Sequence, residues 1–277
     1  MRNYRRVLAA ASFAAVLSTC LLLISSPVVT ETEQDRIDRI NLDIQEKGLH
    51  WTARTTSVSR LSLEEKRALC PLVDPPEFDT SSRPEIRAPE GAAYDPAFDW
   101  RSLGAVTYAK DQGGCGACWV FATTGQLESH VLIYEGRYED LSEQQVMDCN
   151  PWDRGCNGGW AWAAYETYEN YGAVREVCIP YRSSDGYPCN EIYCEPVAWT
   201  TSYTAVGNTV DDIKEALLTG PVYASMDIVD RFYDYSSGCF SWEDEVVGGH
   251  AVLIVGWDDG QCGGDGAWII KNSWGRD

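Results

Sequence analysis

Two cysteines lie three residues apart in the glycine-rich stretch GGCGACWVFA, residues 113–122. Cys115 and Cys118 come just before an apolar run, and three kinds of chemistry suit their types and spacing. They could form half of a zinc site, the two thiols of a redox centre, or a nucleophile beside a structural half-cystine. The rest of the chain must distinguish between these.

Zinc and redox chemistry each need features that the chain supplies poorly. A structural zinc site takes four cysteine or histidine ligands, but no second C-x-x-C occurs and His50, His130 and His250 stand alone. A thioredoxin-like pair normally follows a strand of a βαβ unit, whereas the strand patterns here come late. A nucleophilic cysteine needs a lowered thiol pKa, which a helix N-terminus and an imidazole provide together. We expect no metal and no organic cofactor.

The N-terminus predicts export. Arginines at positions 2, 5 and 6 precede an apolar stretch at residues 7–24, and small residues and Pro27 follow. We predict a signal peptide at residues 1–27, with an uncleaved membrane anchor as the alternative. We therefore expect a secreted protein without a stable membrane span after signal cleavage; a lysosome-like compartment or a membrane-anchored form are the alternatives. In an oxidising compartment clustered cysteines form disulfides.

Composition limits the partners and the fold. The chain has 277 residues, of which 44% are hydrophobic, and its net charge is −20. This is the composition of a globular protein of one or two domains, and its acidity argues against nucleic acid as a partner.

Helix patterns dominate the first part of the chain and strand patterns the last. Ile37, Ile40 and Ile44 recur at helical spacing, and residues 61–69 predict a second helix with Ser62 as N-cap and Glu65 completing a capping box. The other predicted helices are 118–134, one after a capping box at 142–145, 160–171 and 211–219, and the predicted strands are 221–227, 250–257 and 267–273. Helices before strands predict an α+β fold of two subdomains with a cleft between them.

The stretch CGACW matches the C-G-[SA]-C-[WY] signature of papain and the cathepsins. The blocks DWRSLGAVTYAKDQGGCGACWVFA, LSEQQVMDCN, GCNGGW, GPV, GGHAVLIVGWDD and WIIKNSWG follow in the order of that family. The chain thus resembles papain-like cysteine proteases over residues 99–275. The resemblance implies a helical left subdomain and an antiparallel, β-barrel-like right subdomain, with the active-site cleft between them.

The resemblance also implies a role for each matching residue. Cys118 would be the nucleophile and His250 the general base and then acid. Asn272 would orient His250, Gln112 would donate to the oxyanion, and Trp274 would shield the His250–Asn272 bond from water. The residues implied to bind substrate are Gly158, Gly159, Trp160, Ala161, Ser225, Gly249 and Trp274. The implied activity is cleavage of polypeptides through an acyl thioester. Endopeptidase activity is expected because the paired-histidine loop of cathepsin B is absent. We expect a monomer.

Eleven cysteines include Cys20 in the predicted signal peptide and Cys118 as nucleophile, so nine remain and one is unpaired. The resemblance implies the pairs Cys115–Cys156 and Cys149–Cys189, and relatives similar to cathepsin C imply Cys178–Cys194. Cys239 and Cys262 bracket the predicted strand of His250, and we predict that they pair. Cys70 is the cysteine left over.

The segment before residue 94 has the layout of a zymogen. Residues 40–70 resemble the short pro-segment of cathepsin B-like enzymes, with Trp51, Thr52 and Ala53 at a W-x-A-G pattern and Arg54 replacing its glycine. Such a segment would lie along the cleft and inhibit the enzyme. Residues 71–90 carry five prolines, which predicts an exposed, cleavable linker. A small N-terminal domain on a tether is the alternative.

We therefore divide the chain into a signal peptide (1–27), a pro-segment with linker (28–93), a helical subdomain carrying Cys118 (94–207) and a β subdomain carrying His250 and Asn272 (208–277). Family members continue beyond the NSWG block, so the β subdomain is expected to lack C-terminal strands. Two further functions stay open. One is a truncated, inactive homologue that binds or inhibits, and the other is a thiol–disulfide oxidoreductase that uses Cys115 and Cys118.

Overall fold

The structure, a computed structural model, describes residues 31–71, 84–152, 154–189 and 193–276. The predicted signal peptide lies outside these residues, as does most of the predicted linker. Residues from Glu33 onward form one compact unit. Within the described residues, no helix has both the length and the apolar character needed to cross a bilayer.

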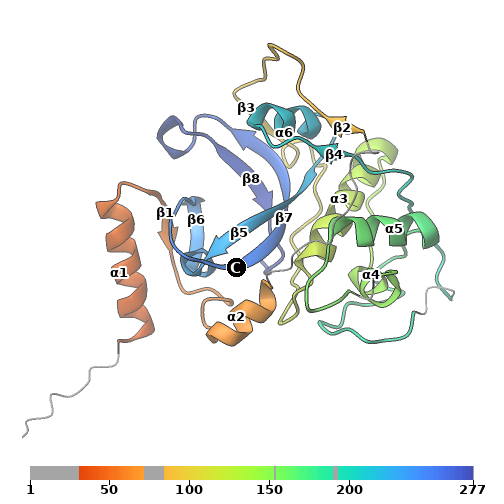
Figure 1. Cartoon of the computed structure of the whole chain (residues 1–277), viewed down its shortest axis with the longest axis horizontal. Helices are drawn as coiled ribbons and strands as arrows, with labels where there is room; N and C mark the ends of the chain where they lie inside the picture. The colour runs from red at the N-terminus through yellow and green to blue at the C-terminus, as the bar shows by residue number, and fades with distance from the viewer. Residues whose placement is uncertain (1–30, 72–83, 153, 190–192, 277) are drawn as a thin grey trace, which may run out of the picture. The chain divides into compact units, whose positions relative to one another are not determined.

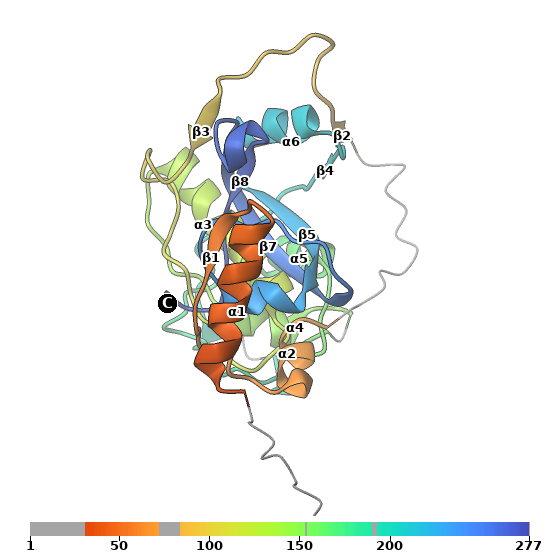
Figure 2. The same cartoon turned by 90° about the vertical axis from the view of Figure 1, so that its left-hand side faces the viewer.

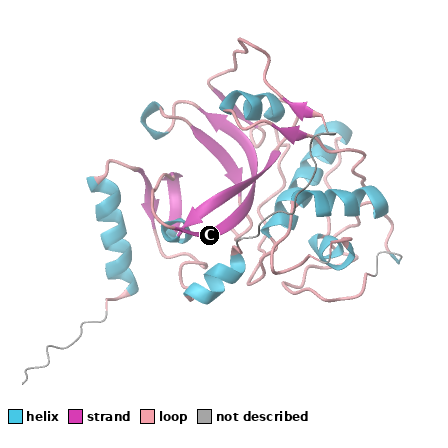
Figure 3. Cartoon of the chain, viewed as in Figure 1, coloured by secondary structure: helices cyan, strands magenta, loops and turns pink. Residues whose placement is uncertain are grey.

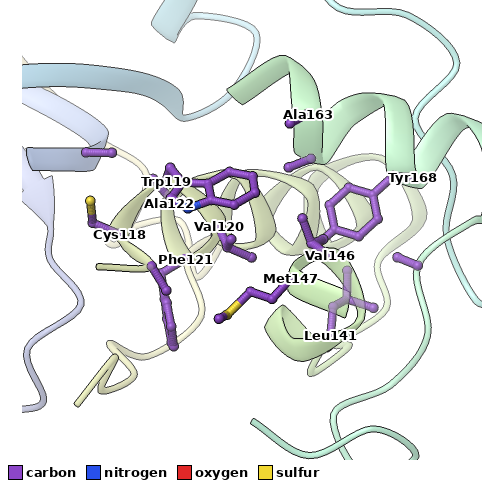
Figure 4. Close-up of a cluster of buried hydrophobic side chains, with 14 of the residues drawn as sticks. Cys118, Trp119, Val120, Phe121, Ala122, Leu141, Val146, Met147, Ala163 and Tyr168 are labelled. Carbon is purple, nitrogen blue, oxygen red and sulfur yellow. The ribbon is translucent and has the colours of Figure 1, made fainter. Parts of the chain in front are cut away.

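Three helices pack together into one half of the unit (Figures 1 and 3). They are α3 (Cys118–Glu135), α4 (Glu143–Cys149) and α5 (Ala161–Tyr171). Every residue in the first two turns of α3 is buried, because this end lies between the other helices and a β-sheet. Figure 4 shows their apolar cluster, with Cys118 at one end and Tyr168 at the other. The nucleophile candidate is therefore attached to a rigid core.

The helix caps agree only partly with the sequence patterns. α2 (Leu63–Leu69) has the complete capping box of Ser62 and Glu65. At α4, Ser142 Oγ accepts the Gln145 N–H as predicted, but the return bond of the box is replaced. The Gln145 side chain instead donates to the Gly172 carbonyl and accepts from the Val174 N–H. It therefore ties α4 to the chain that leaves α5.

The other half is an antiparallel sheet around the long strand β7 (Val246–Asp258). β7 pairs with β3 (Ala97–Asp99), β5 (Val222–Val229) and β8 (Ala267–Lys271). Helix α6 (Val210–Leu217) packs on the sheet through a cluster that includes Leu217 and Trp257. Among the described residues the sheet does not close into a barrel. β3 belongs to this sheet although its residues precede Cys118 and fall in the predicted helical subdomain. The boundaries of the predicted subdomains stay a prediction.

The three predicted strands correspond to β5, β7 and β8 with shifted ends, but several short strands were not predicted. These are β1 (His50–Ala53), β2 (Glu85–Ile86), β3, β4 (Ala205–Val206) and β6 (Tyr235–Cys239). None has more than five residues, and each is extended because it pairs with a distant partner.

Residues 33–71, called the N-terminal segment here, pack on the β half. The segment comprises α1 (Glu33–Glu46), β1 and α2, which Figure 2 shows at the front of the molecule. β1 pairs antiparallel with β6 (Figure 1). The predicted apolar face of α1 packs on Trp51 and Phe240. Arg36 makes two hydrogen bonds, of 2.6 and 2.7 Å, to the buried carboxylate of Asp234. Asp234 ends the short 3-10 helix η2 (Asp230–Asp234).

Four disulfides join the pairs expected from the sequence. They are Cys115–Cys156, Cys149–Cys189, Cys178–Cys194 and Cys239–Cys262. Among the described cysteines, Cys70 and Cys118 are unpaired, and both are buried.

Candidate active site

Cys118 is the first residue of α3, and its side chain is buried at the helix N-terminus. Backbone N–H groups of Ala251, Trp119 and Cys118 itself point at its sulfur and favour the thiolate. Burial outweighs them and raises the pKa of the Cys118 thiol to about 11. In this state the residue is a neutral thiol.

His250 and Asn272 come together because β7 and β8 are neighbours. His250 lies in β7, Asn272 follows the last residue of β8, and Leu253 pairs with Lys271. His250 Nε2 lies 2.7 Å from Asn272 Oδ1, and this oxygen also accepts the Ser273 N–H at 2.7 Å. Because an oxygen faces Nε2, this nitrogen carries the proton, and Nδ1 is left as an acceptor.

The imidazole of His250 lies in an aromatic pocket and is only 2% exposed. The Trp274 ring centroid is 4.7 Å from it and that of Phe232 is 6.5 Å away. Burial lowers the pKa of His250 to about 4, against the opposing effect of the Asn272 hydrogen bond. A neutral imidazole of His250 therefore accompanies a neutral thiol of Cys118 in this structure.

Gln112 is fully buried and is held from both ends of its amide. Its Oε1 accepts the Ser273 hydroxyl at 2.6 Å, and its Nε2 donates to the carbonyls of Cys115 at 2.9 Å and Leu69 at 3.1 Å. The short stretch Asn272–Ser273 thus orients both His250 and Gln112. The amide N–H₂ of Gln112 faces the loop that leads to Cys118.

Residues 68–71 of the N-terminal segment cross this site. Gln112 binds the Leu69 carbonyl, and the Gly249 N–H donates to the Cys70 carbonyl at 3.2 Å. The Cys70 sulfur lies 3.6 Å from His250 Nδ1. A Cβ on Gly116 would lie 2.8 Å from both the Ala68 oxygen and a Pro71 ring carbon, so this close crossing requires glycine there. The segment thus occupies the space beside the side-chain N–H₂ group of Gln112.

The predicted substrate-binding residues lie in two places. Gly249 and Trp274 are beside His250. Gly158, Gly159, Trp160 and Ala161 lie on the helical side, where a Cβ on Gly159 would come within 2.5 Å of the Trp119 ring. Arg154 covers the Trp160 ring at 4.0 Å from its centroid.

Ser225 is exposed on β5 opposite Ala251, the residue after His250. Its hydroxyl bonds that of Tyr223 at 3.3 Å. Tyr223 and Ala161 both line a cavity of about 730 Å³. Ser225 thus lies at the β side of the site and Ala161 at the helical side.

Sequence reasoning missed three residues at the site. Ser273 stands in a matched block without an assigned role, although it holds Gln112. No sequence pattern pointed to Tyr223. Cys70 had one, because the odd number of cysteines left it unpaired, but nothing in the sequence placed it beside His250. Within the described residues no group of three or more His, Cys, Asp or Glu side chains is arranged to hold a metal ion.

Comparison with known proteins identifies the family. Residues 94–277 match the family described as papain family cysteine protease. The chain belongs to the papain family. Zingipain-2 of Zingiber officinale is 38% identical to this papain-family protein over 183 residues, which are 65% of this chain and 81% of zingipain-2. Ananain of Ananas comosus is 35% identical over 227 residues, which are 81% of this chain but 61% of ananain.

A solved structure extends the likeness to the N-terminal segment. The recombinant stem bromelain precursor has a TM-score of 0.72 and 30% identity to this papain-family chain, and the match covers 87% of this chain and 78% of that one. The predicted papain-like α+β fold is therefore confirmed, and the chain falls in the class of cysteine-type endopeptidases. The cathepsin B-like character of the segment stays a prediction.

Proposed function

We propose that the chain is the zymogen of a secreted cysteine endopeptidase that cleaves polypeptides through an acyl thioester on Cys118. The observation that carries this proposal is the 2.7 Å contact of His250 Nε2 with Asn272. It leaves Nδ1 as the nitrogen that can accept a proton. The four disulfides support secretion, since such bonds persist in oxidising compartments.

The geometry supports the following steps once the N-terminal segment has left. Nδ1 of His250 takes the thiol proton, and the Cys118 sulfur attacks the substrate carbonyl. Gln112 Nε2 and the Cys118 backbone N–H stabilise the oxyanion, at about 2.7–4 kcal/mol for one such donor. His250 then protonates the leaving amine, and water, deprotonated by the same Nδ1, releases the acyl group.

The contacts of residues 68–71 support the proposal that the N-terminal segment inhibits the enzyme. A carbonyl of the segment takes the Gln112 donor, and the Cys70 side chain lies against Nδ1. Arg54, which replaces a glycine of the family pattern, needs no left-handed backbone there. Its N–H donates to the Asp234 carbonyl at 2.9 Å, so the replacement is compatible with docking.

The two alternative functions receive less support. An oxidoreductase would need Cys115 and Cys118 as a pair, but Cys115 is bonded to Cys156. An inactive homologue is not favoured by a site in which Gln112, His250 and Asn272 are all oriented by hydrogen bonds.

Titration with an epoxide inhibitor of papain-like thiols tests the proposal. After reduction and removal of the segment, mass spectrometry should find one adduct, on Cys118. The adduct should be absent in Cys118→Ala and form slowly in His250→Ala. A peptide blocked at both ends and cleaved internally would support endopeptidase activity. A folded, processed protein that takes no label and cleaves no such peptide would be the inactive homologue.

A further inference from the structure

Cys70 is fully buried against the imidazole of the proposed catalytic pair. Its carbonyl accepts the Gly249 N–H, and its sulfur is 3.6 Å from His250 Nδ1. Since Nε2 donates to Asn272, the Cys70 thiol is the donor to Nδ1. A thiol of the N-terminal segment thus uses the nitrogen that the mechanism reserves for Cys118.

Helix α2 holds Cys70 in this position through contacts on the preceding turn. Lys66 Nζ is 3.1 Å from an Asp230 carboxylate oxygen and lies over the Tyr233 ring, 4.9 Å from its centroid. The Tyr233 hydroxyl donates to the Lys66 carbonyl at 3.0 Å. The Leu69 side chain is buried among Ile228 and its neighbours. These contacts keep the Cys70 backbone beside His250 as long as α2 stays docked.

Cys118 lies beside the residue that follows His250. The N–H of Ala251, the residue after His250, points at the Cys118 sulfur. Gly116, two residues before Cys118, contacts Ala68 and Pro71, which flank the Leu69–Cys70 pair. The only two unpaired cysteines among the described residues are thus both close to His250 and Ala251.

We propose that Cys70 and Cys118 form a reversible disulfide that locks the zymogen until a reductant opens it. This inference rests on the proposed function, because it makes the pro-segment a covalent as well as a docked inhibitor. The oxidant we infer is a small-molecule disulfide of the glutathione type, as exported proteins meet during folding.

The reaction balances as two thiol–disulfide exchanges. His250 Nδ1 takes the Cys70 proton, and the Cys70 thiolate attacks oxidised glutathione, forms a mixed disulfide and expels one glutathione thiolate, which takes the proton from Nδ1. Nδ1 then takes the Cys118 proton, and the Cys118 thiolate attacks the Cys70 sulfur and expels the second glutathione, which is protonated in its turn. Two protein thiols are oxidised and one glutathione disulfide is reduced to two thiols. A dithiol reductant reverses both steps.

The surroundings of Cys70 leave room for the exchange partner. Cys70 borders a cavity of about 340 Å³, also lined by Arg67, Glu245, Val246 and Val247. This cavity lies beside α2 and gives a small disulfide an approach toward Cys70.

Non-reducing peptide mapping of the full chain tests the proposal. The zymogen is equilibrated with oxidised glutathione, free thiols are alkylated, and the peptides are identified. We expect a Cys70 peptide linked to a Cys118 peptide, and epoxide labelling reduced to background. Dithiothreitol at a concentration that leaves Cys115–Cys156 intact should restore both free thiols.

Cys70→Ser is the matched variant, since a hydroxyl keeps the hydrogen bond to His250 but cannot be oxidised. Epoxide labelling of this variant should no longer depend on the glutathione redox state. Recovery of Cys70 and Cys118 as free or only glutathionylated residues in folded, oxidised wild type would overturn the disulfide. If that occurs while the processed Cys70→Ser variant is labelled on Cys118, the disulfide is ruled out and the proposed protease function remains supported. If the processed variant takes no label at all, the proposed function fails, whatever the mapping shows.

Discussion

The side chain of Gln112 donates a 3.1 Å hydrogen bond to the main-chain carbonyl of Leu69. The donor expected to stabilise the oxyanion is therefore taken by a carbonyl of the N-terminal segment. The same crossing buries His250 and Cys118, and burial accounts for the neutral forms of both. In this closed state the site residues are in place, but Cys118 and His250 are both uncharged. We make four predictions.

Gln112→Ala should lower kcat/KM of the processed enzyme by about 10²–10³, mostly through kcat, because one oxyanion donor is lost. Steady-state kinetics with a peptide substrate would measure this. Gln144, a fully buried glutamine in α4 that bonds the Arg182 N–H, is the matched control. Gln144→Ala should lower the melting temperature but keep kcat. Equal losses of kcat in both variants would argue against an oxyanion role for Gln112.

Acid should open the N-terminal segment. The pKa of His250 is about 4 in the closed state, against about 6.5 for a solvated histidine. Between these values the open state binds more protons, so the closed state loses stability as pH falls from about 6.5 toward about 4. Burial raises the pKa values of Cys70 and Cys118, so neither thiol titrates in this window.

Hydrogen exchange of Cys118→Ala zymogen, which cannot process itself, would measure this opening. Amides of α2 should lose protection as pH falls through that window, once intrinsic exchange is corrected, whereas amides of α5 should not. Protection of α2 that stays constant or rises toward acid would contradict the assignment to His250.

Arg36→Met should weaken docking of the segment, because it leaves the Asp234 carboxylate buried without its partner. We expect a loss of about 2 kcal/mol, below the 3–5 kcal/mol of fully buried pairs, because the Arg36 side chain is 26% exposed. The rate at which a protease removes the segment measures the change. Arg60→Met is the control, since Arg60 and Glu33 form an exposed pair at 3.7 Å that should contribute under about 0.5 kcal/mol. Similar rates for the two variants would exclude a special role for Arg36.

Glu128→Ala should lower the free energy of unfolding by about 3–5 kcal/mol, as when a partner of a buried ion pair is removed. Glu128 lies fully buried in α3 and accepts hydrogen bonds from Lys110 Nζ at 2.8 Å and the Leu141 N–H at 3.0 Å. Lys110 lies two residues before Gln112, so this network also holds the Gln112 loop. Urea unfolding would compare it with Glu135→Ala, an exposed glutamate on the same helix paired with Arg137. A loss no larger than that of Glu135→Ala would contradict the prediction.

Much of the site could be predicted from local sequence. The α3 helix and its first residue Cys118 follow from an apolar run after a glycine-rich loop, and the capping box of Ser62 and Glu65 forms as expected. Such signals are readable because a helix makes its hydrogen bonds within one turn. The order of the family blocks then supplied His250, Asn272 and Gln112, which periodicity alone would not have distinguished.

The tertiary structure decided what depends on distant partners. β1 and β3 are extended because β6 and β7 pair with them, and the Gln145 side chain leaves its capping box because Gly172 and Val174 lie within reach. The odd cysteine count showed that a cysteine was left over, but only the docking of α2 placed Cys70 against His250. A sequence pattern reflects the hydrogen bonds that a residue makes with its near neighbours in the chain. The position of a thiol relative to an imidazole 180 residues away is set by the packing of the whole unit.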